Sequence, residues 1–291
     1  MLIRISSIVL GMLTLFTSSA FTADFVAVRD LFTVTTTEEA LWEALPEETA
    51  TEEAILKAGG VCDFIKTTER RTCLFKVRDG QRLRVFVYDA DSSGAYSRTE
   101  DICLPTWYSE AAIATADVLG DGRKALLIEH FGNVGTNTDQ RILAILAWHS
   151  ASAGDEGAFR LIFWETVSYH IGFGGDNRQL DVAYDLLPTN SPPEIRLTYH
   201  YKTARSDLPF FEVAWQDRLI WNAEQFRFKD PELGQKIAAC RFDAGACIQK
   251  NIYATRLKRS EINSFAPFCE AGDDAEMLEL HNPYAPCWPE E

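Results

Sequence analysis

The sequence predicts a mainly β protein of antiparallel strands, and two observations support this fold class. Between Val61 and Lys229, short β-branched and aromatic runs alternate with clusters of Gly, Asp, Asn and Pro, a texture typical of strands and turns. No amphipathic stretch of helix length separates these runs, which disfavours a parallel βαβ arrangement. The clearest predicted strands are Leu83–Tyr88, Ala125–His130, Ile142–Trp148, Phe159–Tyr169, Glu194–Tyr201 and Phe210–Trp215.

The first twenty residues have the features of a secretory signal peptide. Arg4 supplies the positive charge, Ile8–Phe16 the apolar stretch, and small residues precede a cleavage site near Ala20. The apolar stretch is shorter than the roughly 20 residues that span a bilayer, and no later segment has about 18 uninterrupted apolar residues. We therefore expect a secreted or periplasmic chain with no membrane insertion after cleavage; an uncleaved anchor is the alternative.

Changes in composition divide the rest of the chain into three parts. Residues 21–60 form an N-terminal helical segment, with helices expected at Thr37–Leu45 and Thr51–Lys57. Residues 61–230 form the β-rich domain, and residues 231–291 form a Cys- and Pro-rich extension that we expect to be tied by disulfides.

Charge and composition narrow the class of partner. The 291 residues carry 28 Lys or Arg against 43 Asp or Glu, a formal net charge of −15, and 46% are hydrophobic. This balance is that of a globular protein without a broad basic surface, so we expect no nucleic-acid partner.

The chain has seven cysteines, and export favours disulfides over free thiols. Pairing each cysteine with a sequence neighbour leaves Cys103 over, but the spacing does not fix the connectivity, and the unpaired cysteine could be any of the seven. The neighbour pairs are Cys62–Cys73, Cys240–Cys247 and Cys269–Cys287.

Two stretches in the middle of the chain share a spacing. Asp117 precedes Trp148 by 31 positions and Asp185 precedes Trp215 by 30, and in both stretches a Phe-Arg pair begins 11 positions after the tryptophan. A repeated unit of several strands is typical of a β-propeller blade or a stacked β-unit. The sequence therefore predicts propeller-like repeat units, the alternative being coincidence between two hairpins.

The segment Asp117-Val118-Leu119-Gly120-Asp121-Gly122, followed by the apolar run Ala125–Ile128, resembles the FG-GAP or VCBS-type repeat of integrin-alpha-like propellers. That resemblance implies a propeller fold and a calcium ion held at the loop by Asp117 and Asp121. This chain has Leu119 where the family pattern usually has an oxygen ligand.

A second candidate calcium site has the spacing of an EF-hand loop. Asp89, Asp91 and Ser93 stand at positions 1, 3 and 5, Gly94 at position 6 and Glu100 at position 12. The alternative is a polar turn between two strands, where Asp, Ser and Gly are favoured in any case.

Glu165 and Glu129 are the candidates for acid–base catalysis. Alternation along Phe159–Tyr169 puts Glu165 on one face with Phe163 and Val167, and an apolar setting raises the pKa of a carboxyl, as a general acid requires. Glu129 is the second carboxyl of a glycosidase-like pair. The alternative is a Glu that reaches solvent or an arginine.

The sequence has no recognisable catalytic motif, which favours a binding role over an enzymatic one. We expect an exported, non-enzymatic protein that binds a protein or glycan partner through a β scaffold, with calcium as the expected cofactor. The alternatives are a secreted carbohydrate-active hydrolase using Glu165 and Glu129, and a structural envelope component.

Overall fold

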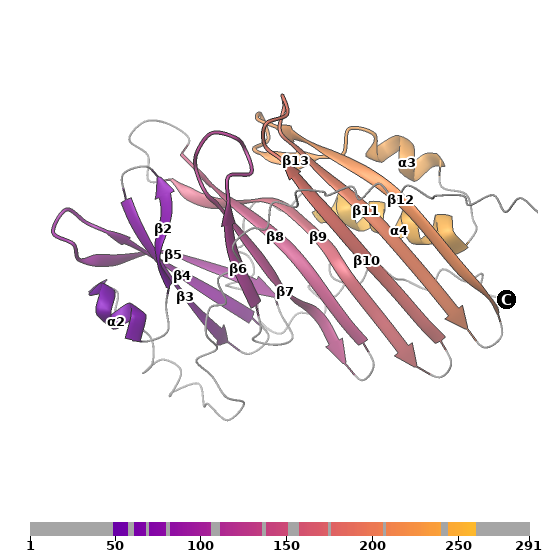
Figure 1. Cartoon of the computed structure of the whole chain (residues 1–291), viewed down its shortest axis with the longest axis horizontal. Helices are drawn as coiled ribbons and strands as arrows, with labels where there is room; N and C mark the ends of the chain where they lie inside the picture. Colours follow the sequence, from indigo (N-terminus) through magenta and orange to yellow (C-terminus); the bar gives the residue numbers. More distant parts are fainter. Residues whose placement is uncertain are drawn as a thin grey trace, which may run out of the picture.

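A computed structural model describes residues 49–57, 61–67, 70–79, 82–105, 111–135, 138–150, 157–173, 176–205, 208–239 and 244–259. The predicted signal peptide, the first predicted helix and residues 260–291 lie outside these ranges. The described strands form two antiparallel sheets, of five and eight strands (Figure 1). The predicted fold class, mainly β with antiparallel strands, is confirmed.

The smaller sheet has the strand order β1-β5-β4-β3-β2. A six-residue helix, α2 (Glu52–Lys57), follows its first strand and lies inside the segment expected to be helical. The strands are β1 (Thr49–Ala50), β2 (Val61–Thr67), β3 (Arg70–Asp79), β4 (Arg82–Ala90) and β5 (Tyr96–Pro105).

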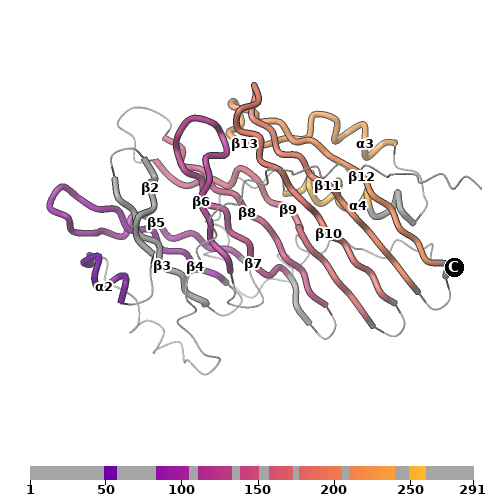
Figure 2. Tube along the Cα trace, viewed as in Figure 1, coloured from indigo at the N-terminus to yellow at the C-terminus, as the bar shows by residue number. Residues whose placement is uncertain are grey.

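The larger sheet is a continuous meander in which every strand pairs with its neighbours in sequence, from β6 to β13 (Figure 2). All six strands expected from the sequence lie within β4, β7, β8, β9, β11 or β12. The strands are β6 (Ala111–Ala116), β7 (Ala125–Gly135), β8 (Thr138–His149), β9 (Ala158–Phe173), β10 (Asp176–Leu187), β11 (Glu194–Arg205), β12 (Leu208–Asn222) and β13 (Arg227–Lys229).

The described strands do not form a closed propeller, and the two tryptophans of the predicted repeat differ in their surroundings. Trp148, at the end of β8, meets the Phe159 ring edge-on at 5.5 Å and packs against the core between the two sheets. Trp215, in the middle of β12, stacks on Tyr199 at 4.7 Å in the other core. The predicted equivalence of these positions is therefore wrong; successive hairpins of similar length produce similar spacings without a repeated blade.

Strands β6–β9 are covered on both faces, which explains their almost continuous apolar sequence. One face packs against β4 and β5 of the smaller sheet, and the other faces the core that includes α4 (Ala244–Arg259). Five successive residues of β8, Ile142–Leu146, are fully buried, as two-sided burial requires. Glu100 joins the sheets, because its Oε2 accepts a hydrogen bond of 2.8 Å from the Phe159 amide.

The larger sheet separates between β9 and β10 at one end. β10 pairs with β9 only over Asp176–Asp181, opposite Ser168–Phe173, whereas it pairs with β11 over its full length. The short strand β13 lies close to β9 and continues the sheet beyond β12. β9 and β12, the two strands that α4 contacts, lie on either side of this separation in the strand order.

Residues 231–259 do not form the disulfide-tied appendage that the sequence predicts for residues 231–291. α3 (Leu233–Ala239) and the sixteen-residue α4 follow β13; α4 packs against β9 and β12, and α3 packs against α4 (Figure 1). α4 contributes Ile252 and Tyr253 to the core and ends in Arg256, Lys258 and Arg259, which suit the negative end of the helix dipole. No helix in the described part of the chain is both long and apolar enough to cross a membrane.

Candidate functional site

Arg256, in the last turn of α4, is the centre of a buried ionic cluster. Its Nε lies 2.9 Å from Oε2 of Glu165, its Nη1 2.9 Å from Oδ2 of Asp230, and its Nη2 3.1 Å from Oδ2 of Asp217. Nη2 also donates a hydrogen bond to the Tyr199 hydroxyl. None of these five residues is more than 9% exposed. The cluster thus joins α4 to β9, β11, β12 and the segment after β13.

Lys236 and Tyr253 complete the contacts of the carboxylates. Lys236 Nζ lies 2.8 Å from Asp230 and 3.0 Å from Asp217, and the Tyr253 hydroxyl donates to Asp217 at 3.1 Å. Burial alone would lower the pKa of Lys236, but the two carboxylates outweigh it and raise that pKa. Burial and the charge on Asp217 raise the pKa of Tyr253, so its hydroxyl stays protonated and donates.

The cluster is balanced in charge. Glu165, Asp217 and Asp230 stand opposite Arg256, Lys236 and Arg259, whose Nη1 is 3.8 Å from Glu165. Burial would lower the pKa of Arg256, yet the groups around it, Tyr199, Glu165 and Asp217, raise that pKa well above its usual value. Arg256 therefore remains a cation, and its removal would leave buried carboxylates without their main counter-ion.

A cavity of about 210 Å³ lies beside the cluster, between the end of α4 and strands β9 and β13. Its described lining holds four cationic side chains and two carboxylates. The remaining lining side chains are apolar. The charged residues are Arg227, Lys229, Arg256, Arg259, Glu165 and Asp230, and the apolar ones are Phe163, Trp164, Leu219, Phe228, Leu233 and Leu257.

The two arginines that line the cavity away from the cluster centre are held in place by the protein. Arg227 Nη2 donates to the backbone carbonyl of Arg259 at 3.3 Å, and burial lowers the pKa of this guanidinium. The guanidinium carbon of Arg259 lies 5.2 Å from the centre of the Trp164 ring, a cation–π contact. Both positive charges are thus held at the wall of the cavity.

Glu165 and Glu129, predicted as a catalytic pair, lie on one face in the same cross-strand row, separated by Leu143 of β8. Phe163 and Val167 are buried in one core, as expected, but the Glu165 carboxylate is bound by Arg256 and approached by Arg259, which corresponds to the alternative of a Glu that reaches an arginine. Glu129 pairs with Arg141 at 3.3 Å. The two carboxylates are therefore engaged by different cations.

The residues of the EF-hand-like spacing point to different partners. Asp91 Oδ1 accepts hydrogen bonds from the Ser93 amide at 2.7 Å, the Ser93 hydroxyl at 2.6 Å and the Ala95 amide at 3.1 Å, which closes a tight turn. These bonds also lower the pKa of Asp91, with the Ser93 side chain as the largest cause. Asp89 is buried and accepts from Thr99 at 3.0 Å, whereas Glu100 reaches β9.

The loop of the FG-GAP-like segment is closed by its own side chains. Asp117 accepts hydrogen bonds from the amides of Gly120 at 2.7 Å and Gly122 at 2.9 Å. Asp121 accepts from the Arg123 amide at 3.0 Å and pairs with its guanidinium. Within the described residues, no group of three or more His, Cys, Asp or Glu side chains is arranged to hold a metal ion. Calcium at either loop stays a prediction.

The cysteine pairing also stays a prediction. Cys103 is fully buried in the core between the two sheets. The side chains of the other six cysteines lie outside those that the structure describes.

The centre of the cluster was not predicted, although the sequence contains a signal for it. Asp217 follows Val213 and Trp215 in the inward phase of β12, so a carboxylate stands where an apolar residue is expected. Arg256 lies three and four positions after Tyr253 and Ile252, on the face of α4 that enters the core. A charged residue on the buried, otherwise apolar face of both β12 and α4 indicates that these two elements form a buried ion pair.

Comparison with known proteins identifies no relative. No family model matches the chain, and no curated protein or solved structure matches it either. The resemblance to FG-GAP repeats therefore has no support beyond the residues that carry it.

Proposed function

We propose that this chain is an exported, non-catalytic binding protein whose ligand site is the cavity beside the Arg256 cluster. The proposal rests on how positive and negative side chains are distributed between the cluster and the lining of this cavity. The buried carboxylates Glu165, Asp217 and Asp230 are bound by Arg256 and Lys236 and approached by Arg259, and the described lining of the cavity holds four cationic side chains and two carboxylates. The export part of the proposal rests on residues 1–20.

The ion pairs of Glu165 support binding over hydrolysis. A general acid or base has to exchange protons with a substrate, whereas Oε2 of Glu165 is bound by Arg256 and its Oε1 is approached by Arg259. Glu165 is only 3% exposed and its Oε2 lies 2.9 Å from Arg256. In this arrangement the carboxylates fix α4 against the sheet, and α4 in turn forms one wall of the cavity.

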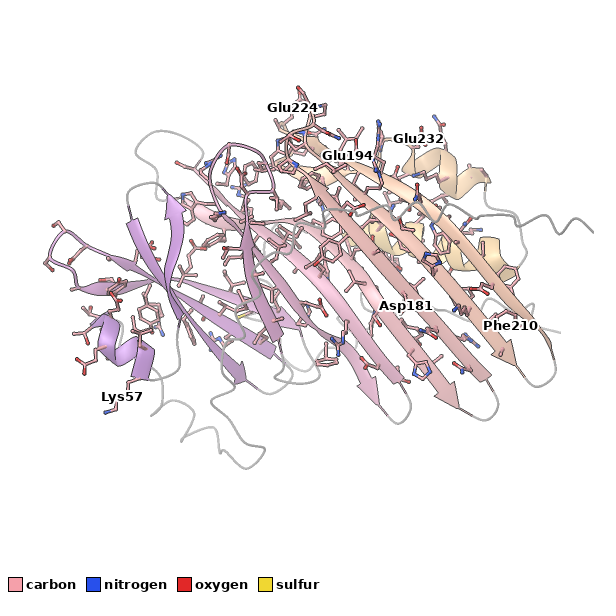
Figure 3. The ribbon with its side chains drawn as sticks, in the orientation of Figure 1. Lys57, Asp181, Glu194, Phe210, Glu224 and Glu232 are labelled. Carbon is pink, nitrogen blue, oxygen red and sulfur yellow. The ribbon has the colours of Figure 1, made fainter. Side chains whose placement is uncertain are left out.

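The exposed face of β10–β12 supports a small ligand over a large protein partner. Most of its described side chains, such as Asp181, are polar or small, and charges of both signs are mixed across it, but Phe210 of β12 is 64% exposed (Figure 3). Lys202 pairs with Glu212 at 3.6 Å on this face. A face of this kind is well solvated, whereas the core of a stable protein interface is depleted of charge.

The proposal is tested by screening small metabolites, sugars included, for saturable thermal stabilisation of the mature protein. Leu257 lines the cavity and is 49% exposed, so Leu257→Trp should fill its entrance and abolish the stabilisation. Leu56→Trp is the matched control, since Leu56 is also 49% exposed but lies on α2.

The hydrolase alternative is tested separately with a panel of glycosidase and esterase substrates. We expect no turnover. Turnover that is lost in Glu165→Gln, while the variant keeps its fold, would replace the binding proposal with the enzymatic one.

A further inference from the structure

The edge of β12 that faces away from β11 is a second candidate binding surface, separate from the cavity. β12 is the outermost long strand of the larger sheet, and the short strand β13 pairs only with Ile220–Asn222 (Figure 1). Lys236 of α3 binds Asp217 at 3.0 Å, so the chain after β13 lies beside the next part of the strand. In the described part of the chain, no strand pairs with this edge along Phe210–Gln216.

The main-chain groups of β12 alternate in direction along the strand, as in any antiparallel pair. The amide of Trp221 donates to the carbonyl of Pro193, which directly precedes β11, and the pairing with β11 is regular over this stretch. The odd-numbered residues therefore direct their N–H and C=O groups towards β11. The even-numbered Glu212, Ala214 and Gln216 direct theirs outward, and such a row of unpaired donors and acceptors is a template for another strand.

The side chains beside this edge include apolar ones that are only partly covered. Phe211, Val213 and Trp215 face the core and are half-buried, whereas Leu219, farther along the same face, is only 3% exposed. Phe210, at the start of the segment, is 64% exposed (Figure 3). A strand added at this edge would bury part of this apolar surface, which favours association.

We infer that this edge pairs with the same edge of a second copy of the chain and forms a two-fold symmetric dimer. Addition of a strand to a sheet edge is a recurring mode of recognition, and a two-fold axis brings one surface against itself. In an antiparallel pair centred on Val213, Glu212 of each copy exchanges main-chain hydrogen bonds with Ala214 of the other. Phe211 of each copy then lies opposite Trp215 of the other, and directly opposite aromatic side chains stabilise a sheet.

The sequence of the edge favours the register centred on Val213. A centre on Glu212 would place this carboxylate opposite its own copy, and like charges directly opposite each other are destabilising. A centre on Ala214 would place Phe211 opposite Asp217, where α3 already lies. The register centred on Val213 therefore matches apolar residues with apolar residues and keeps like charges out of directly opposite positions.

The association is measured on the mature wild-type protein by sedimentation equilibrium at increasing concentration. We expect the mass to rise from that of one chain towards that of two. Ala214→Glu should weaken the dimer about tenfold, because the two-fold axis places the new charge opposite Glu212 of the other copy twice. Ala214→Lys places opposite charges there and should strengthen the dimer by a similar factor. The matched control is Ala183→Glu, an equally exposed-class position on the inner strand β10, which should leave the association unchanged.

Hydrogen exchange of single amides tests the same edge without any substitution. The amides of Glu212 and Ala214 should exchange at least about tenfold more slowly at concentrations at which the dimer forms than in dilute protein. The amide of Trp215, which is directed towards β11, should be protected at both concentrations.

Three outcomes would overturn the inference. The first is a mass of one chain at every concentration. The second is slow exchange of the Glu212 and Ala214 amides in the single-chain species, because the edge would then be covered within the chain. The third is a dimer whose affinity is the same in Ala214→Glu and Ala214→Lys, since its contact would then lie elsewhere.

Discussion

Replacing Arg256 by Met tests whether the ionic cluster fastens α4 to the sheet. The substitution keeps the length of the side chain and removes the cation that contacts Glu165, Asp217 and Asp230 at 2.9–3.1 Å. Removing one partner of a buried ion pair costs about 3–5 kcal/mol, because the remaining charges are left uncompensated. Since folded domains have about 5–15 kcal/mol of stability in total, we expect a large loss in the free energy of unfolding.

The loss is measured by urea unfolding at pH 7, with Arg218→Met as the matched control. Arg218 has a side chain that is 60% exposed and lies 3.7 Å from Glu194, so its removal should cost no more than about 1 kcal/mol. The two variants remove the same charge from the same type of side chain. The difference between them is therefore the effect of burial and of the cluster.

A double-mutant cycle separates the ion pair from packing. Glu165→Gln together with Arg256→Met should be less destabilised than the sum of the single variants, by about 0.5–3 kcal/mol, because the two residues share the contact at 2.9 Å. Additive effects, or an Arg256→Met loss no larger than that of Arg218→Met, would refute the claim that this cluster holds α4 in place.

Three further predictions concern other parts of the molecule. His130 is fully buried, and burial lowers its pKa to about 4 from an ordinary 6.5, so the unfolded chain takes up a proton first as the pH falls. The free energy of unfolding should therefore decrease between about pH 6.5 and pH 4 by up to about 3 kcal/mol. In urea unfolding at pH 7 and pH 5, His130→Leu should show a smaller decrease than the wild type, whereas the exposed-site variant His200→Leu should show the same decrease as the wild type. Gly120→Ala should be more destabilising in thermal melts than Gly122→Ala, because both glycines have positive φ but only at Gly120 would a Cβ collide with the Pro188 carbonyl oxygen; equal costs would contradict this reasoning. The calcium prediction requires that added calcium raise the melting midpoint and that a chelator reverse it, and an unchanged midpoint would remove both acidic loops as calcium sites.

The strands could be predicted because their signals are local. Alternation of apolar and polar residues, or an apolar run such as Ile142–Leu146, depends on a few neighbouring positions and on the period of a strand. β10 carries the same alternating signal, with Leu180, Val182 and Tyr184 on one face and Asp181 and Asp185 on the other, but it is not among the strands predicted from the sequence. The division into two sheets depends on which strands share a core, and this is a non-local property.

The spacing that predicted repeat units is explained by the regular geometry of a meander. Strands of 12–16 residues joined by short turns return a given residue type at similar intervals, with no repeated fold behind it. Trp148 and Trp215 show this, because they face different cores. The matching intervals reflect strand length and turn length alone.

Helix α4 was overlooked because Cys240 and Cys247 gave that region the composition of a disulfide-tied tail. Its own residues are nevertheless compatible with a helix, since Ala, Gln, Lys, Arg and Leu have high helix propensity. The cluster that α4 forms brings together residues up to 91 positions apart in sequence, from Glu165 to Arg256. The only sequence signal for such a contact is a charged residue at a position where the pattern of the strand or helix calls for an apolar one.

The most direct test of the account is to map the binding of a stabiliser from the metabolite screen on the protein by methyl-detected NMR. The account predicts saturable shifts of the methyl groups of Leu219, Leu233 and Leu257, which line the cavity from three different elements. The methyl groups of Leu56 on α2 should not move. Shifts that never saturate, or that occur at Leu56 while the three cavity leucines stay unchanged, would contradict the claim that this cavity is the ligand site.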